Sequence, residues 1–156
     1  MITFRLATAV DDDALIRLIL SLYREDSSPD RPTETSARMA LLTLRETPAW
    51  GHAIVIEDAG TIAGYALLIS FYSNELRGRV CVLDELYVAP SFRGCGIGRA
   101  FLEALAGRSL PVFSDAVALE LEVSPKNKRA RALYANAGFA PIRNTTMRRA
   151  LGSSSL

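Results

Sequence analysis

The sequence predicts a single mixed α/β domain, and three observations support this. The chain has 156 residues, 49% hydrophobic and 22% charged, which is the composition of one globular domain with a sizeable core. Segments with alternating apolar residues, typical of strands, are interspersed with segments of helical periodicity. No internal repeat, low-complexity block or linker divides the chain. We therefore expect residues 1–150 to form one domain and residues 151–156 to be a flexible tail.

The first half of the chain predicts a strand, two helices and a hairpin. Ile2, Phe4 and Leu6 alternate with polar residues, which indicates a short half-buried strand. A helix follows, capped by Asp11. The apolar positions on one face of this helix are Leu15, Leu18, Ile19 and Leu22. Further along, we expect a helix from about 33 to 45, and strands over 53–57 and 62–72 joined by a tight turn at Asp58-Ala59-Gly60.

The second half predicts three further strands and two helices. In order, they are a strand over 80–88 ended by Pro90, a helix over 97–106 stopped by Gly107, a strand over 117–123, a helix over 127–137 ended by Gly138, and a last strand or hairpin over 139–149.

Charge is unevenly placed along the chain. The formal net charge is only +1, but residues 1–78 hold 7 Arg, no Lys and 11 acidic residues, whereas residues 79–156 hold 11 basic and 6 acidic residues. This predicts an anionic ligand handled by the second half and a cationic one by the first, with two solvated surfaces of no significance as the alternative. Arg148-Arg149 is too brief a basic cluster to indicate nucleic-acid binding.

Compartment and metal binding are predicted from what the sequence lacks. No secretory signal precedes Asp11, and the longest run without charge, residues 59–74, is too short to cross a bilayer, so we expect a cytoplasmic protein without membrane contact. Cys81 and Cys95 fit neither a disulfide framework nor paired metal-ligand spacing, so we expect no metal.

The most informative segment is the glycine-rich turn between the predicted strand over 80–88 and the helix that follows. Backbone N–H groups at such a junction point outward at the positive end of the helix dipole and can hold a phosphate, although many such turns are merely tight connections. A P-loop is excluded because Gly98 is followed by Arg99-Ala100. A dinucleotide-binding fingerprint is disfavoured, because its third glycine would fall at Arg99, even though Glu122 would suit a ribose hydroxyl.

The remaining pattern is R-x-x-G-x-G, formed by Arg93, Gly96 and Gly98 after a strand and Val-x-Pro. A second block runs from Leu121 to Phe139 as a strand, an Asn, a helix, Leu-Tyr and Gly-Phe. In both blocks the sequence resembles the GNAT superfamily of N-acetyltransferases. The resemblance covers roughly residues 80–140, whereas the first 50 residues match only in the order of their elements.

The resemblance implies a fold and a cofactor site. The fold is a central, mostly antiparallel, twisted sheet of six to seven strands flanked by about four helices, with a splayed strand pair holding coenzyme A. The residues implied for acetyl-CoA are Leu86, Tyr87 and Val88 on the strand, Arg93, Gly94, Cys95, Gly96, Ile97, Gly98 and Arg99 in the turn, and Asn127 and Tyr134. Asn127 and Tyr134 are two helical turns apart and can face the same groove. The residues alone, without the resemblance, favour a helix cap for Asn127 and a core aromatic for Tyr134.

Acetyl transfer to an amine makes chemical demands that can be compared with the sequence. A lysine-like amine has a pKa of about 10.4, so a carboxylate, directly or through water, must help to remove its proton. Glu122 and Asp84 are the candidate bases, and Tyr134 matches the family's acid. Strict alternation places residues 80, 82, 84, 86 and 88 on one face, with Glu85 pointing away unless a bulge shifts the register.

The acceptor is expected to be a primary amine of a small molecule or peptide. The family holds its acceptor with two loops, and the corresponding candidates here are Glu25 and Asp26 in one and Tyr72 and Glu75 in the other. Glu85, on the strand over 80–88, is a further candidate. Carboxylates suit a cationic amine, and solvated loop charge is the alternative. A coenzyme A-binding regulatory module without catalysis is the opposing function. The resemblance also suggests a homodimer through C-terminal strands.

Overall fold

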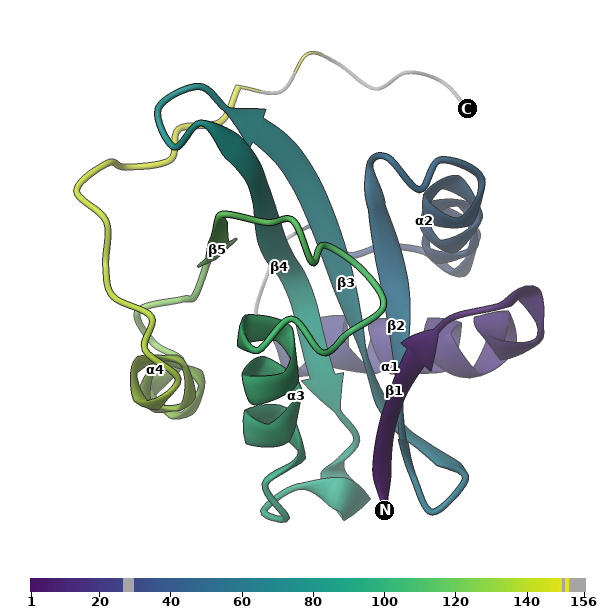
Figure 1. Cartoon of the computed structure of the whole chain (residues 1–156). Coiled ribbons are helices and arrows are strands. Elements are labelled where there is room, and N and C mark those ends of the chain that lie inside the picture. The colour runs from purple at the N-terminus through teal and green to yellow at the C-terminus, as the bar shows by residue number, and fades with distance from the viewer. Residues whose placement is uncertain (27–29, 150, 152–156) are drawn as a thin grey trace.

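The computed structural model describes residues 1–26, 30–149 and 151, so the predicted tail lies, apart from Leu151, outside the described residues. The chain forms a sheet with helices on both faces (Figure 1). In sequence order the strands and helices are β1 (Ile2–Leu6), α1 (Asp12–Glu25), α2 (Glu34–Glu46), β2 (Gly51–Asp58), β3 (Thr61–Ser73), β4 (Gly78–Val88), α3 (Ile97–Ala106), β5 (Ala118–Leu121) and α4 (Lys128–Asn136). Short 3-10 turns precede α1 (Ala9–Asp11) and follow β4 (Pro90–Phe92).

The sheet has the strand order β1-β2-β3-β4-β5. The first three pairings are antiparallel and β4 pairs with β5 in parallel, so the mostly antiparallel sheet that the resemblance implies is confirmed. The β2–β3 hairpin turns at Ala59-Gly60, where both residues have positive φ angles. The helices expected in four regions are all present within the described residues.

Two apolar clusters hold helices against opposite faces of the sheet. On one face, Leu15 and Ile19 of α1 and Leu41 of α2 pack against Val55 and Tyr65. On the other face, α3 is anchored by Phe101, which is fully buried and meets Phe4 edge-on with ring centroids 5.4 Å apart. Burying a side chain of this size stabilises the fold by roughly 1.5–3 kcal/mol.

The start of α1 differs in detail from the expectation. Asp11 occupies the N-cap position, but its carboxylate makes no cap hydrogen bond to α1. It accepts instead from the Thr8 backbone N–H at 2.8 Å and from the Arg5 guanidinium at 2.8 Å. The pKa of Asp11 is lowered, first because Arg5 donates to the carboxylate, so this buried group is held ionised.

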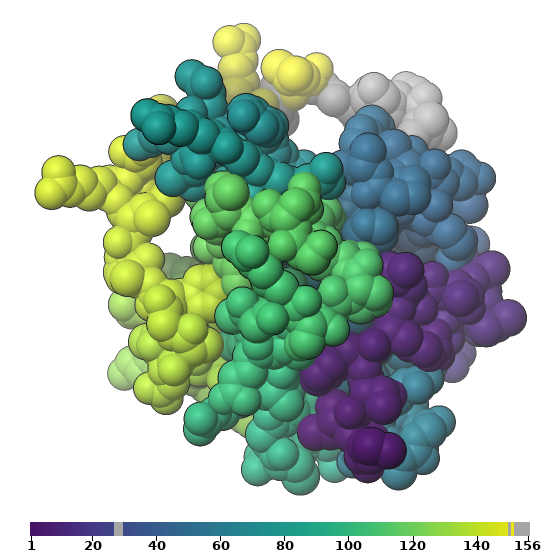
Figure 2. All heavy atoms as spheres, viewed as in Figure 1, coloured from purple at the N-terminus to yellow at the C-terminus, as the bar shows by residue number. Residues whose placement is uncertain are grey.

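Within the described part of the chain the sheet has five strands instead of the six to seven expected, because residues 139–149 form neither a strand nor a hairpin. Pro141 lacks an N–H for a ladder, and Ile142 and Met147, the apolar residues that a strand would bury, are 70% and 92% exposed. This segment lies on the outside of the molecule (yellow in Figure 2).

A bulge in β4 corrects the strict alternation predicted for this strand. Leu68 pairs with Leu83 and Leu67 with Glu85, so Asp84 is the extra residue. Upstream, Leu83 faces the α3 side of the sheet; downstream, Leu86 faces that side and Tyr87 faces α1. A one-residue insertion reverses the faces of all residues that follow, so Glu85 points toward α1.

Candidate active site

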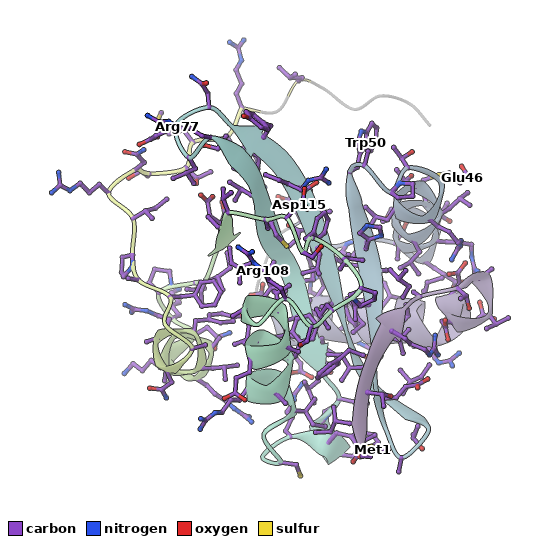
Figure 3. All side chains as sticks on the ribbon, viewed as in Figure 1. Met1, Glu46, Trp50, Arg77, Arg108 and Asp115 are labelled. Atoms are coloured by element: carbon purple, nitrogen blue, oxygen red, sulfur yellow. The ribbon has the colours of Figure 1, made fainter. Side chains whose placement is uncertain are left out.

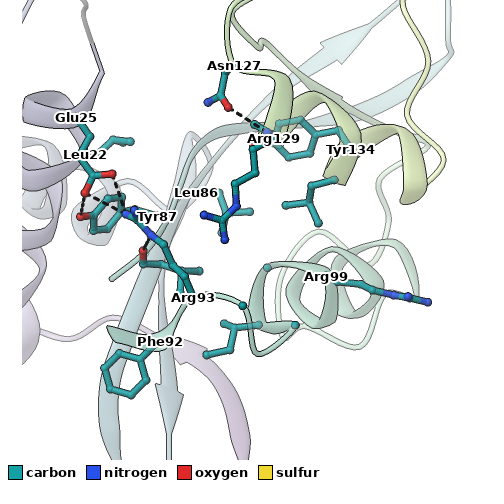
Figure 4. Close-up of a pocket in the computed structure, with 17 residues that line it drawn as sticks. Leu22, Glu25, Leu86, Tyr87, Phe92, Arg93, Arg99, Asn127, Arg129 and Tyr134 are labelled. Atoms are coloured by element: carbon teal, nitrogen blue, oxygen red, sulfur yellow. Dashed lines mark hydrogen bonds and ion pairs between the residues drawn. The ribbon is translucent and has the colours of Figure 1, made fainter. Parts of the chain in front are cut away.

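A groove of about 390 Å³ opens between the end of β4, the glycine-rich turn, the start of α3, and α4 (Figure 4). All the residues that the resemblance implies for the cofactor line it, except Cys95, which is exposed outside it. The groove is also lined by residues that sequence reasoning missed, namely Leu22, Phe92, Arg129, Ala130 and Leu133. The two sequence blocks therefore meet in space.

One wall of the groove is a strand with unpaired backbone groups. The β4–β5 pairing ends at Leu83 and Leu121, and the two strands separate beyond this point; we call this opening the splay. Ala89 N–H still donates to Ala63 on β3 (2.8 Å), whereas the Val88 carbonyl accepts from the Arg93 side chain (2.7 Å). Since backbone groups alternate in direction along a strand, those of Leu86 and Val88 point into the splay.

The floor of the groove is the glycine-rich turn. Gly94 and Gly96 have φ angles of +82° and +79°, which L side chains rarely adopt, and a Cβ at either would meet nothing within 4 Å. The backbone conformation therefore requires a glycine at both positions. At Gly98, a Cβ would lie 3.3 Å from Leu133 of α4, so this glycine allows the two helices to approach closely.

The turn ends in a helix N-terminus with free donors. The first helical hydrogen bond of α3 runs from Ala100 N to Gly96 O (2.9 Å), so the N–H groups of Ile97, Gly98 and Arg99 have no acceptor within the helix. The Ile97 side chain is 2% exposed, so only its backbone can serve a ligand. These N–H groups and the helix dipole make an anion-binding corner.

The guanidinium groups of both arginines in the turn form ion pairs with glutamates. Arg93 extends toward α1, where it pairs with Glu25 at 2.9 Å and lies over the Tyr87 ring. Arg99 pairs with Glu103 at 2.7 Å and points away from the groove (Figure 4). Arg129, in the first turn of α4, instead extends into the groove toward Leu86, and is the cation that sequence reasoning missed.

The opposite wall comes from α4. The Asn127 side chain accepts from Ala130 N–H at 3.0 Å, so it caps the helix, and it also lines the groove. Tyr134 lines the groove too and packs edge-on against Phe139, with ring centroids 6.0 Å apart. Among the described residues nothing hydrogen-bonds its hydroxyl, and that hydroxyl is not sealed from solvent. Burial raises the pKa of Tyr134, so the phenol stays protonated at neutral pH.

Asp84 and Glu122 lie on either side of the splay where it begins. Each follows the last paired residue of its strand, Leu83 on β4 and Leu121 on β5. The pKa of Asp84 is raised, first because the surrounding protein limits its hydration although the side chain remains exposed, and second because Glu122 is negatively charged. The structure thus brings the two candidate bases together.

Glu85 lies on the α1 side of β4. Its carboxylate accepts from the Tyr65 hydroxyl at 2.6 Å and from the Tyr23 hydroxyl at 2.7 Å. Burial raises the pKa of Glu85, and the two hydroxyl donors oppose that rise. Sequence reasoning missed both tyrosines, since contacts between α1, β3 and β4 have no local signal.

The other acceptor candidates are dispersed. Glu25 accepts from the Tyr87 hydroxyl at 2.6 Å and from Arg93, and both bonds lower the pKa of Glu25. Asp26 follows at the end of α1, next to residues outside the described ranges. Tyr72 is the residue before the last of β3 and Glu75 lies in the turn that follows, so both are near the tip of the β3–β4 hairpin. Arg77, labelled in Figure 3, belongs to the same tip. That tip is roughly 20 Å along β4 from Asp84, so the structure does not bring Tyr72 or Glu75 to the groove.

Comparison with known protein families shows which family this chain belongs to. A family model described as the acetyltransferase (GNAT) family matches residues 16–139, which include β4, the glycine-rich turn and α4. The chain belongs to the GNAT family of acetyltransferases. This family uses acetyl-CoA, and the groove has the features that such a ligand needs: backbone groups for an amide-containing arm and a helix N-terminus for phosphates.

Individual relatives agree with the family assignment. The chain is 29% identical to a thialysine N-epsilon-acetyltransferase of Bos taurus over 141 residues, covering 85% of this chain and 81% of the relative. Its fold is similar to a structure described as a possible acetyltransferase from Clostridium difficile 630, with a TM-score of 0.85, 16% identity, and coverage of 98% and 99% of the two chains. It is also similar to a predicted acetyltransferase of Clostridium acetobutylicum solved with acetyl-CoA, with a TM-score of 0.76, 18% identity and 96% coverage of both chains.

Residues 1–26, 30–149 and 151 contain no group of three or more His, Cys, Asp or Glu that could hold a metal ion. Within the same ranges, no helix has the length and apolar character required to span a membrane.

Proposed function

We propose that this GNAT protein transfers the acetyl group of acetyl-CoA to a primary amine of a small molecule or peptide, by direct attack within a ternary complex. The observation that carries the proposal is the splay: a groove suited to the cofactor opens along it with the Tyr134 side chain in its wall, and two carboxylates stand where the strands separate. Acetyl-CoA supplies an activated thioester, so the protein need not supply a nucleophile. The similarity to an enzyme that acts on thialysine supports an amine acceptor.

The groove residues hold the donor in this account. N–H groups of Ile97, Gly98 and Arg99 bind the pyrophosphate, and Arg129 adds a positive charge. The backbone groups of Leu86 and the N–H of Val88 pair with the amides of the pantetheine arm, because the Val88 carbonyl already accepts from Arg93. An N–H of this strand also stabilises the negative charge that develops on the carbonyl oxygen during attack.

Proton transfers involve both walls. The amine nitrogen bonds to the acetyl carbon as the carbon–sulfur bond breaks. The proton that the amine loses passes, directly or through water, to the Asp84–Glu122 pair. Tyr134 donates its proton to the departing thiolate, and the raised pKa of Tyr134 keeps that proton in place beforehand.

A direct assay tests the proposal. The purified protein is incubated with acetyl-CoA and thialysine, lysine or a peptide with a free N-terminus, and both released thiol and acetylated product are measured. We expect thiol release that depends on the amine, with one N-acetylated product per thiol. Binding of acetyl-CoA without transfer to any amine would instead support the coenzyme A-binding regulatory module. The homodimer and the cytoplasmic location stay predictions.

The role of Arg129 gives a separate prediction. Arg129→Ala removes the cation that extends into the groove, so the KM for acetyl-CoA should rise about tenfold while the KM for the amine stays unchanged. Arg131→Ala, two residues further along α4 and not in the groove wall, is the matched control. Equal effects of the two substitutions on the KM for acetyl-CoA would contradict the assignment.

A further inference from the structure

Glu85 is a half-buried carboxylate that forms no ion pair with any described residue. Its two oxygens are each bound by a different tyrosine, Tyr65 from β3 and Tyr23 from α1. Tyr65 is fully buried, so its hydroxyl is fixed by the packing of the core. Three separate elements thus converge on one carboxylate.

The groups around Glu85 leave it without positive charge. Glu85 faces Tyr23 of α1 and Tyr65 of β3, and Asp84 is its neighbour on β4. Asp26 is close enough for its negative charge to raise the pKa of Tyr23. Burial raises the pKa of both tyrosines, so each remains a hydrogen donor at neutral pH. Two donors favour the ionised form of Glu85, which can only accept.

A purely structural role does not account for this arrangement. A desolvated carboxylate without a cation lowers the stability of the folded protein. Proteins are often as stable or more stable when apolar residues of similar volume replace buried charged groups. The bulge at Asp84 turns the Glu85 side chain toward α1. Glu85 directly follows Asp84, which marks the start of the splay, and this is where the proposed amine arrives. The missing positive charge can therefore come from the acceptor.

We propose that Tyr23 and Tyr65 are positioning residues for the acceptor, which hold the Glu85 carboxylate in one orientation as the anion that attracts a positively charged amine. The inference rests on the proposed function, because it presupposes an amine acceptor. The tyrosines act through Glu85 and do not touch the acceptor themselves.

Steady-state kinetics with thialysine test the proposal, supported by calorimetric binding of thialysine to the protein saturated with coenzyme A. We expect Tyr65→Phe and Tyr23→Phe each to raise the KM and the dissociation constant for thialysine about tenfold, with the KM for acetyl-CoA unchanged. The pH below which thialysine binding weakens should move higher, because the lost donor no longer favours ionised Glu85. Ser70→Ala, which removes a β3 hydroxyl that donates to the Ala49 carbonyl, is the control.

A double substitution separates positioning from stability. Once Glu85→Gln removes the titrating group, Tyr65→Phe should have no further effect on the KM for thialysine. Tyrosine variants that lower the thermal midpoint but leave the pH dependence of thialysine binding and the KM for thialysine unchanged would overturn the inference. A wild-type protein that neither acetylates nor binds any amine of the panel would instead overturn the proposed function.

Discussion

Tyr134→Phe is expected to lower kcat for acetyl transfer about a hundredfold, within the range usual for loss of a general acid. The substitution removes the hydroxyl that donates to the departing thiolate but keeps the ring that packs against Phe139 and lines the groove. The KM for acetyl-CoA and the unfolding midpoint should therefore stay close to those of the wild type. Stopped-flow detection of thiol release measures the effect.

The pH profile gives a second readout for Tyr134. An acid must be protonated to act, so activity is lost as pH rises through its pKa. Because burial raises the pKa of Tyr134, the basic limb of wild-type kcat should lie above the ordinary tyrosine pKa of about 10. The variant should lack this limb. A variant with wild-type kcat would contradict the assignment and favour water as the proton donor.

Asp84→Asn combined with Glu122→Gln is expected to lower kcat/KM for the amine about a hundredfold at neutral pH, because both candidate bases where β4 and β5 separate are then removed. Each single substitution should cost less, since the remaining carboxylate can reach the amine through water. Initial rates measured across pH with saturating acetyl-CoA give these values.

The two single variants should also differ in their pH dependence. A base must be deprotonated, so the acid limb of kcat/KM follows the raised pKa of Asp84. Glu122→Gln removes the negative charge that contributes to this rise, so the limb should move to lower pH. Asp115→Asn, in an exposed surface ion pair with Arg79, provides a carboxylate control. A double variant as active as that control would exclude the pair as the base.

The parts of the site encoded locally could be predicted from the sequence. The positive φ angles at Gly94 and Gly96, the helix that begins at Ile97, and the spacing of Asn127 and Tyr134 are all properties of short segments. Such backbone geometry can be predicted from a short sequence pattern because it is determined by residues that are close together in the chain. The predicted glycine turn and last helix accordingly meet in one groove.

The parts that depend on pairing between distant segments could not be predicted. The bulge at Asp84 arises from the register of β4 against β3, and it alone decides that Glu85 faces the tyrosines. The direction of Arg93 depends on Glu25, a residue 68 positions away. The strand expected over 139–149 is absent, because a pattern compatible with a strand does not ensure that the segment pairs with a sheet edge.

The central claim is that the groove binds acetyl-CoA, and a thermal-shift titration with acetyl-CoA, coenzyme A and NADH tests it most directly. A ligand that binds only the native state adds about 2.7 kcal/mol at a hundredfold excess over its dissociation constant, which corresponds to several degrees for a chain of this size. We predict a rise in the midpoint with both coenzyme A species and none with NADH. If neither coenzyme A species raises the midpoint, or if NADH raises it equally, the account is contradicted.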